Sequence, residues 1–210
     1  MAALAGSPIT DRSATAAMPE SRDIRQNSAC MVEILGMSKA NTSDVLVISA
    51  SNGENLKLAQ RFVETAGSLG QSANLLDLTT IDLPLFTPRA QTQGTPEAIA
   101  PLEAQLMASP RWVICAPEYN GSIPPCFTNA IAWLSVQGHD FRALFNSRPI
   151  AIATFSGGGG MELLLSLRIQ LTHLGAEVVG RQLLSNYSKP AKVDSIKDLL
   201  HRLGQRQPIQ

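Results

Sequence analysis

Short runs of apolar and β-branched residues alternate along the chain with longer segments in which apolar residues recur at helical spacing. The short runs predict five strands, at 44–50, 72–78, 111–116, 149–155 and 176–183. The longer segments predict five helices, at 54–70, 95–108, 125–134, 161–175 and 195–204. Strand and helix therefore alternate five times.

This alternation predicts an α/β fold. The strands are almost uninterrupted apolar runs, which is typical of a parallel sheet covered by helices on both faces. Five units are too few for an eight-fold barrel, so we expect a three-layer, doubly wound fold with a five-stranded parallel sheet. Sheets of this kind bind ligands beyond the carboxyl ends of their strands.

Residues 1–42 have a different pattern from the rest of the chain. They are rich in Ala, Ser, Asp, Arg and Asn, with no apolar period that would face a core. We expect a disordered N-terminal extension here, followed by a single domain over 43–210. A transit peptide is the alternative, although Asp11, Glu20 and Asp23 make the segment more acidic than such peptides usually are.

Composition narrows the class of partner. Lysine plus arginine and aspartate plus glutamate number 17 each, so the sequence predicts neither a nucleic-acid surface nor an anionic-membrane surface. No run approaches the roughly 20 apolar residues that span a bilayer. Cys30, Cys115 and Cys126 show no CxxC spacing, which suits a reducing compartment. We expect a cytoplasmic protein that acts on a small molecule.

The loop after the first predicted strand, SASNGEN at 49–55, suits a phosphate. It leads directly into a helix, and backbone amides at a helix N-terminus carry partial positive charge. Small hydroxyl and amide side chains add donors beside them. The candidate ligands are Ser49, Ser51, Asn52, Gly53 and Asn55. Because Ser and Asn are also good helix caps, capping alone is an alternative explanation of this loop.

The loop after the third predicted strand reads APEYNGSIP at 116–124. A carboxylate there is unsuited to a phosphate, so we expect the loop to lie along a polar aromatic ring system. Pro117 and Pro124 restrict the loop and lower the entropic cost of holding its shape. The candidate contacts are Pro117, Glu118, Tyr119, Asn120 and Gly121.

Four consecutive glycines follow the fourth predicted strand, in FSGGGGM at 155–161. Such a run costs backbone entropy and adds no packing, which favours a ligand that approaches the main chain closely. A flexible turn is the alternative. The candidate contacts are Ser156, Gly157, Gly158 and Gly159.

Other chemistries lack their motifs. The sequence contains no GxGxxG, no GxxxxGK[ST] and no GxSxG, and no histidine lies in the three loops. Metal spacings of the HxxxH or CxxC kind are missing, so we predict no metal. Cys115 and Cys126 are interpreted as core cysteines rather than nucleophiles.

PEYNGSIPPCFTNAIAWLS at 117–135 and SGGGGMELLLSLRIQLTHLGAEVV at 156–179 together resemble the NADPH-dependent FMN reductase family, a flavodoxin-like family that includes quinone, chromate and azo-dye reductases. Arg168 matches the family pattern, whereas Thr128 and Ala132 replace a usual basic and a usual acidic residue. ISASNGENLKLA at 48–59 also departs from the family, because it lacks the arginine and second serine of the family's phosphate loop.

The resemblance implies a flavodoxin-like fold that binds FMN, with the phosphate at 49–55, the isoalloxazine edge at 117–121 and the ring at 156–159. NADPH or NADH would reduce the flavin, which then reduces a small acceptor such as a free flavin or a quinone. The flavin carries the chemistry, so no catalytic side chain is expected. A homodimer or homotetramer is also implied, and the apolar helix at 161–175 agrees with it. A flavodoxin-type electron carrier and a flavin-less binding module are the rival functions.

Overall fold

The computed structural model describes residues 42–138 and 140–207. The expectation of a disordered extension over 1–42 lies outside the described residues, except for Thr42, and stays a prediction. Within the described part of the chain, no helix is long and apolar enough to cross a membrane.

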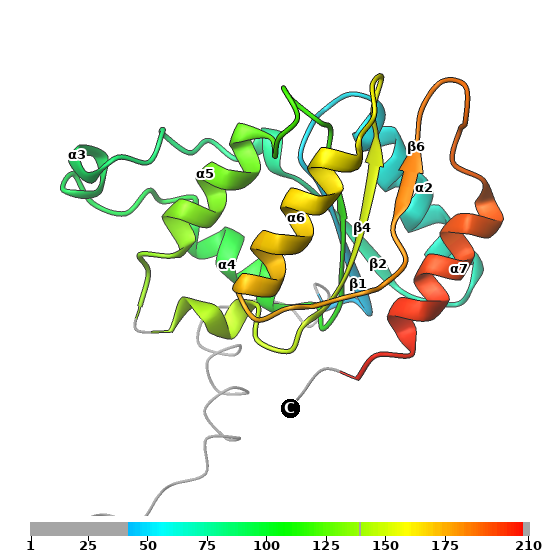
Figure 1. Cartoon of the computed structure of the whole chain (residues 1–210). Helices are drawn as coiled ribbons and strands as arrows, with labels where there is room; N and C mark the ends of the chain where they lie inside the picture. Colours follow the sequence, from blue (N-terminus) through cyan, green and yellow to red (C-terminus); the bar gives the residue numbers. More distant parts are fainter. Residues whose placement is uncertain (1–41, 139, 208–210) are drawn as a thin grey trace, which may run out of the picture. The chain divides into compact units, whose positions relative to one another are not determined.

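A parallel sheet forms the centre of the fold (Figure 1), with the strand order β2-β1-β3-β4-β5 and a sixth strand that pairs with β4. The first four strands are β1 (Val45–Ser49), β2 (Ala73–Asp77), β3 (Trp112–Cys115) and β4 (Pro149–Phe155). All pairings between named strands are parallel. The predicted doubly wound α/β fold is confirmed.

The fifth predicted strand, at 176–183, is wrong in detail because two short strands replace it. β5 (Glu177–Val178) and β6 (Leu183–Ser185) both pair with β4. Between them the chain leaves the sheet, and the Arg168 guanidinium donates to the carbonyl oxygens of Val179 at 3.0 Å and Gly180 at 3.4 Å. Arg168 therefore supplies the hydrogen bonds that the sheet no longer provides there.

The predicted helices are present, with small shifts of their ends. They are α2 (Glu54–Ser68), α4 (Ile99–Met107), α5 (Pro125–Leu134), α6 (Met161–His173) and α7 (Val193–Gly204). A short helix, α3 (Pro88–Gln91), and two 3-10 turns, η2 (Leu78–Thr80) and η3 (Phe141–Leu144), lie in connections that the apolar pattern does not mark.

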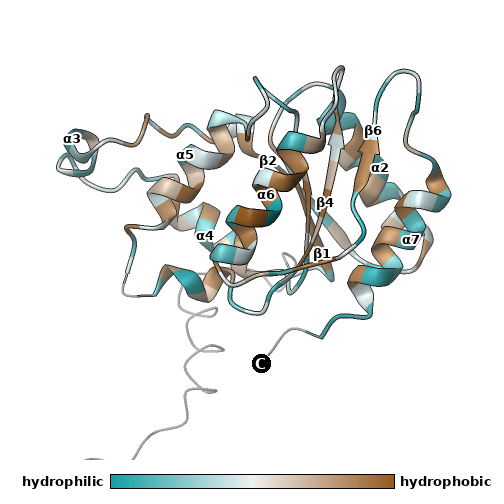
Figure 2. Cartoon of the chain, viewed as in Figure 1, coloured by the Kyte–Doolittle hydropathy of each residue, from teal (hydrophilic) through white to brown (hydrophobic). Residues whose placement is uncertain are grey.

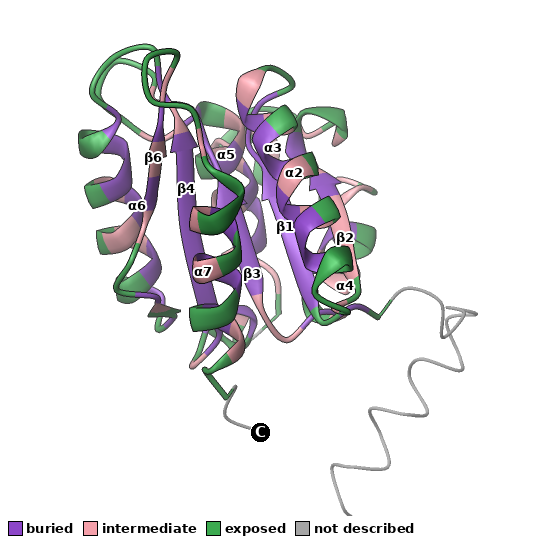
Figure 3. Ribbon diagram, turned by 90° about the vertical axis from the view of Figure 1, so that its right-hand side faces the viewer, coloured by how far each residue is buried: buried purple, intermediate pink, exposed green. Residues whose placement is uncertain are grey.

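The strands bury side chains on both faces, which creates two separate cores. In β1, Leu46 and Ile48 pack on the side of α4, α5 and α6, whereas Val45 and Val47 pack against α2 and α7. Hydrophobic residues accordingly line the strands and the inner sides of the helices (Figure 2). Figure 3 shows α2 and α7 over their face of the sheet, with a continuous buried layer beneath them.

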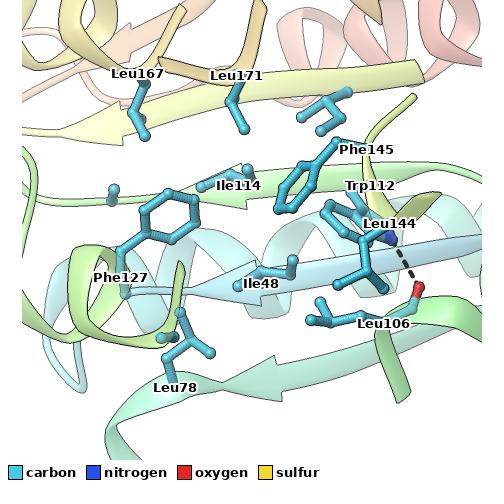
Figure 4. Close-up of a cluster of buried hydrophobic side chains, with 14 of the residues drawn as sticks. Ile48, Leu78, Leu106, Trp112, Ile114, Phe127, Leu144, Phe145, Leu167 and Leu171 are labelled. Atoms are coloured by element: carbon cyan, nitrogen blue, oxygen red, sulfur yellow. Dashed lines mark hydrogen bonds between the residues drawn. The ribbon is translucent and has the colours of Figure 1, made fainter. Parts of the chain in front are cut away.

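The larger core combines aliphatic side chains with a few aromatic ones (Figure 4). Phe127 and Phe145 lie between the strands and the helices, and the Trp112 indole donates to the Leu106 carbonyl oxygen at 3.1 Å. Burying this indole with its polar atom satisfied fixes α4 against β3.

Candidate functional site

The loops after β1, β3 and β4 meet at the carboxyl edge of the sheet, as predicted, and enclose a pocket. In Figure 1 these loops rise together along the upper edge, next to the loop after β6. The pocket has a volume of about 300 Å³. Its lining residues come from four segments and are Ser51, Asn52, Gly53, Glu54, Asn55, Pro117, Glu118, Tyr119, Phe155, Ser156, Gly157 and Tyr187.

Two predicted phosphate ligands, Ser49 and Asn55, form hydrogen bonds with backbone groups of the fold. Ser49 is fully buried, lies outside the pocket lining, and donates through its hydroxyl to the Ser51 carbonyl oxygen at 2.7 Å. The Asn55 amide donates to the Phe155 carbonyl oxygen at 2.9 Å and accepts from the Phe155 amide at 2.8 Å. Asn55 therefore joins the start of α2 to the end of β4, a role that its sequence position alone does not reveal.

The first turn of α2 is open toward the pocket. Gly53 occupies the N-cap position, and no side chain of the described residues caps the turn. Asn52 and Gly53 are exposed. Unpaired amides at a helix N-terminus attract an anion, so this turn has the chemistry of a phosphate site. The alternative explanation, in which a Ser or Asn side chain of this loop caps α2, is therefore wrong.

The loop after β3 contains a tight hairpin turn. Asn120 and Gly121 have φ angles of 51° and 70°, and Tyr119 and Ser122 exchange backbone hydrogen bonds of 3.1 and 3.0 Å. Positive φ at both central residues defines the turn type that an Asn-Gly pair favours. The turn holds Tyr119, about half exposed, at the pocket. Asn120 and Gly121 themselves lie outside the pocket lining.

Glu118 connects the hairpin loop to the glycine loop. Its carboxylate accepts a long hydrogen bond of 3.4 Å from the backbone amide of Leu163, in the first turn of α6. A negative charge at a helix N-terminus is favourable, so this contact stabilises the arrangement of both loops. Glu118 also lines the pocket, where it contributes a carboxylate to the wall.

The glycines after β4 have different roles. Gly157 lines the pocket, together with Ser156, whose hydroxyl accepts from the Gly158 amide at 3.2 Å. Gly158 and Gly159 lie outside the pocket lining. Gly160 has a φ of 73°, and a Cβ atom there would lie 3.0 Å from the Ser156 Cβ and 3.1 Å from the Thr154 Cγ2. Close packing on Ser156 and Thr154 explains why residue 160 is a glycine. The position of Gly157 in the pocket lining agrees with a ligand that approaches the main chain there.

Three pocket residues were not predicted from the sequence. Phe155 ends β4, Glu54 begins α2, and Tyr187 comes from the loop after β6. The Tyr187 ring packs edge-on against the Phe155 ring with centroids 4.9 Å apart. In the sequence, the only indication that Tyr187 belongs to the site is that it is an aromatic residue shortly after a predicted strand. This indication is weak unless the fold is known.

Both described cysteines lie in the core, in agreement with their interpretation. Burial raises the pKa of the Cys115 thiol, and it also raises the pKa of Cys126, whose sulfur donates to the Ala50 carbonyl oxygen at 3.1 Å. Thiols with raised pKa values are poor nucleophiles at neutral pH. Neither cysteine lines the pocket.

Comparison with known proteins agrees with this geometry. A quinone reductase of Escherichia coli strain K12 is 35% identical over 103 residues, which cover 48% of this chain and 53% of that protein. The chain thus matches about half the length of its curated relatives. The flavoenzyme FerB of Paracoccus denitrificans, an NAD(P)H:(acceptor) oxidoreductase, has a similar fold at 19% identity and a TM-score of 0.62, over 79% of this chain and 99% of that one.

An oxidised flavodoxin 2 of Bacillus cereus also shares the fold, at 13% identity and a TM-score of 0.53, over 78% of this chain and 99% of that one. The predicted flavodoxin-like architecture is therefore confirmed. The sequence model of NADPH-dependent FMN reductases matches residues 43–189, which include all four segments of the pocket. The chain belongs to the NADPH-dependent FMN reductase family.

Proposed function

We propose that this protein is an NAD(P)H-dependent reductase that binds FMN in the pocket at the carboxyl edge of the sheet and reduces a small acceptor, such as a free flavin or a quinone. The observation that carries the proposal is the meeting of three separately predicted loops around one pocket, in a chain that belongs to this family.

The residues present fit FMN. The uncapped first turn of α2, with Ser51 and Asn52 beside it, supplies donors for the phosphate. Pro117, Tyr119 and Gly157 line the remaining wall, where small or flat groups leave room for a ring. When bound, FMN supplies the hydride-transfer chemistry, and the protein supplies binding and orientation.

The roles of the surrounding residues follow from their contacts. Asn55 fixes the distance between the phosphate end and the end of β4, and Glu118 fixes the hairpin loop on α6. Tyr119, about half exposed at the pocket, offers a surface on which a flat acceptor or a nicotinamide stacks. The Phe155 and Tyr187 rings pack edge-on and form part of one wall of the pocket.

Self-association is part of the proposal. Met161, Leu165 and Ile169 lie one turn apart on α6 and are 46%, 51% and 71% exposed. Figure 2 shows hydrophobic bands among hydrophilic ones on the side of α6 turned to the viewer. Burial of this row in a homodimer or homotetramer removes apolar surface from water, which size-exclusion chromatography with light scattering tests. A monomer at all concentrations would contradict it.

We also place the protein in the cytoplasm. Cys115 and Cys126 are free thiols, which suits a reducing compartment. Fractionation of cells that express the full chain measures this directly.

The activity is tested with the purified full chain. We expect a flavin absorbance band after incubation with FMN, and oxidation of NADPH or NADH that depends on FMN and on a small quinone. Bound flavin without turnover would instead support an electron carrier. The absence of both a flavin band and turnover would support a flavin-less binding module. Either of these two results would overturn the proposal.

A further inference from the structure

The walls of the candidate flavin pocket carry negative charge without a balancing positive charge. Glu54 and Glu118 supply two carboxylates, and no lysine or arginine is among the described residues that line the pocket. A phosphate monoester carries about two negative charges near neutral pH, so these walls alone would repel it. A cation just outside the lining would offset this repulsion and add to the attraction of the backbone amides in the first turn of α2.

Lys57 is placed to be that cation. It lies one turn after the start of α2, and its ammonium group is 2.7 Å from a carboxylate oxygen of Glu54. The hydrogen bond and the charge of Glu54 raise the pKa of Lys57, and the phenol of Tyr187 raises it to a smaller extent. The Lys57 ammonium therefore lies beside one group of the pocket wall, the Glu54 carboxylate, and its side chain, 70% exposed, is free to turn toward a ligand.

Tyr187 is held at the same end of the pocket despite its exposure. The Asn186 side chain accepts from the Lys189 amide at 2.7 Å and from the Ser188 hydroxyl at 2.9 Å, which makes a compact turn. The Tyr187 ring rests on Phe155. Glu54, Lys57 and Tyr187 thus gather around the uncapped first turn of α2, where backbone amides attract an anion.

We propose that Lys57 recognises the phosphate of the bound flavin and that Glu54 competes with this phosphate for the Lys57 ammonium. The inference deepens the proposed function and rests on it. Loss of the Lys57 charge removes an attraction, so binding of FMN weakens. Loss of the Glu54 charge frees Lys57 and removes a repulsion, so binding of FMN becomes tighter. The pair sets how readily FMN leaves the protein.

The experiment compares FMN with riboflavin, which has the same ring system and no phosphate. Quenching of flavin fluorescence gives the Kd of each for the unchanged chain and for Lys57→Gln, Glu54→Gln and Lys197→Gln. We expect the Kd for FMN to rise roughly tenfold in Lys57→Gln and to fall roughly tenfold in Glu54→Gln. The Kd for riboflavin changes little in either variant, because it lacks the charge that Lys57 and Glu54 act on.

Lys197 is the matched control, because it is a lysine of α7 that lines a different hollow together with Leu69 and Gln71. Its replacement leaves both Kd values unchanged. The Glu54–Lys57 pair is exposed, and exposed ion pairs add little to stability, so thermal denaturation shows all three variants folded.

Some outcomes overturn the inference without touching the proposed function. These are equal binding of FMN and riboflavin by the unchanged chain, an unchanged Kd for FMN in Lys57→Gln, or a weaker affinity for FMN in Glu54→Gln. Binding of neither flavin by the unchanged chain would overturn the proposed function and the inference together.

Discussion

Replacing Gly160 with alanine tests how the glycine loop is built. Gly160 has a φ of 73°, a conformation that costs an alanine about 1–2 kcal/mol. The added Cβ would lie 3.0 Å from the Ser156 Cβ and 3.1 Å from the Thr154 Cγ2, and both atoms belong to short side chains next to the backbone. Crowding of this kind costs about 1–3 kcal/mol, so we expect the free energy of unfolding to fall by roughly 2–5 kcal/mol.

Gly157→Ala is the matched control for this prediction. It lies in the same loop, and a Cβ atom there meets nothing within 4 Å. Urea denaturation followed by circular dichroism gives the free energy of unfolding for both variants. We expect Gly157→Ala to change it by less than about 1 kcal/mol. If Gly160→Ala proved as stable as Gly157→Ala, the close packing of Gly160 on Ser156 and Thr154 would be wrong.

Three further variants or measurements follow from single contacts. Asn55→Ala leaves the Phe155 backbone groups unpaired and should lower the free energy of unfolding by roughly 2–3 kcal/mol. Asn52 is exposed, so Asn52→Ala should change this free energy little. Equal effects of the two substitutions would refute this account. Hydrogen bonds from Ser72 lower the pKa of Asp44 below 3.8, so Asp44 stabilises the fold above that pH and loses this effect as pH falls through its folded pKa. In urea denaturation, the free energy of unfolding of Asp44→Asn should differ from that of the unchanged chain at pH 6 and converge with it in acid. A constant difference at all pH values would contradict this account. Burial raises the pKa of Cys126, so iodoacetamide at pH 8 should alkylate Cys126 far more slowly in the folded chain than in the urea-unfolded chain. Peptide mass spectrometry separates Cys126 from Cys30 and Cys115, and equal rates at Cys126 would contradict the burial.

The sequence predicts the sheet well because its signal is local. β1, β3 and β4 are almost uninterrupted apolar runs, and such runs have few other ways to be buried. The interruption between β5 and β6 depends on Arg168, which reaches from a different element, so the local pattern does not reveal it. The Asn-Gly pair at 120–121 does carry a local signal for a hairpin turn, and interpreting the segment simply as a loop missed it.

The candidate site could be predicted only where it follows strand ends. The three loops after β1, β3 and β4 had to meet, because parallel strands end at one edge. Individual roles depend on side-chain contacts that no spacing encodes. Ser49 and Asn55 resemble ligands by type, yet their polar atoms bond to the backbone of the fold. Tyr187 joins the pocket through its packing on Phe155, which requires the whole sheet to be in place.

The gap between β5 and β6 bears on how copies of this chain meet. A long, unpaired strand at the border of a sheet is a template on which another chain adds a strand, and this leads to aggregation. Here the border strands are two and three residues long, and Arg168 occupies carbonyl groups between them. Strand addition has no continuous row of partners along this border, so we expect copies of the chain not to pair their sheets there.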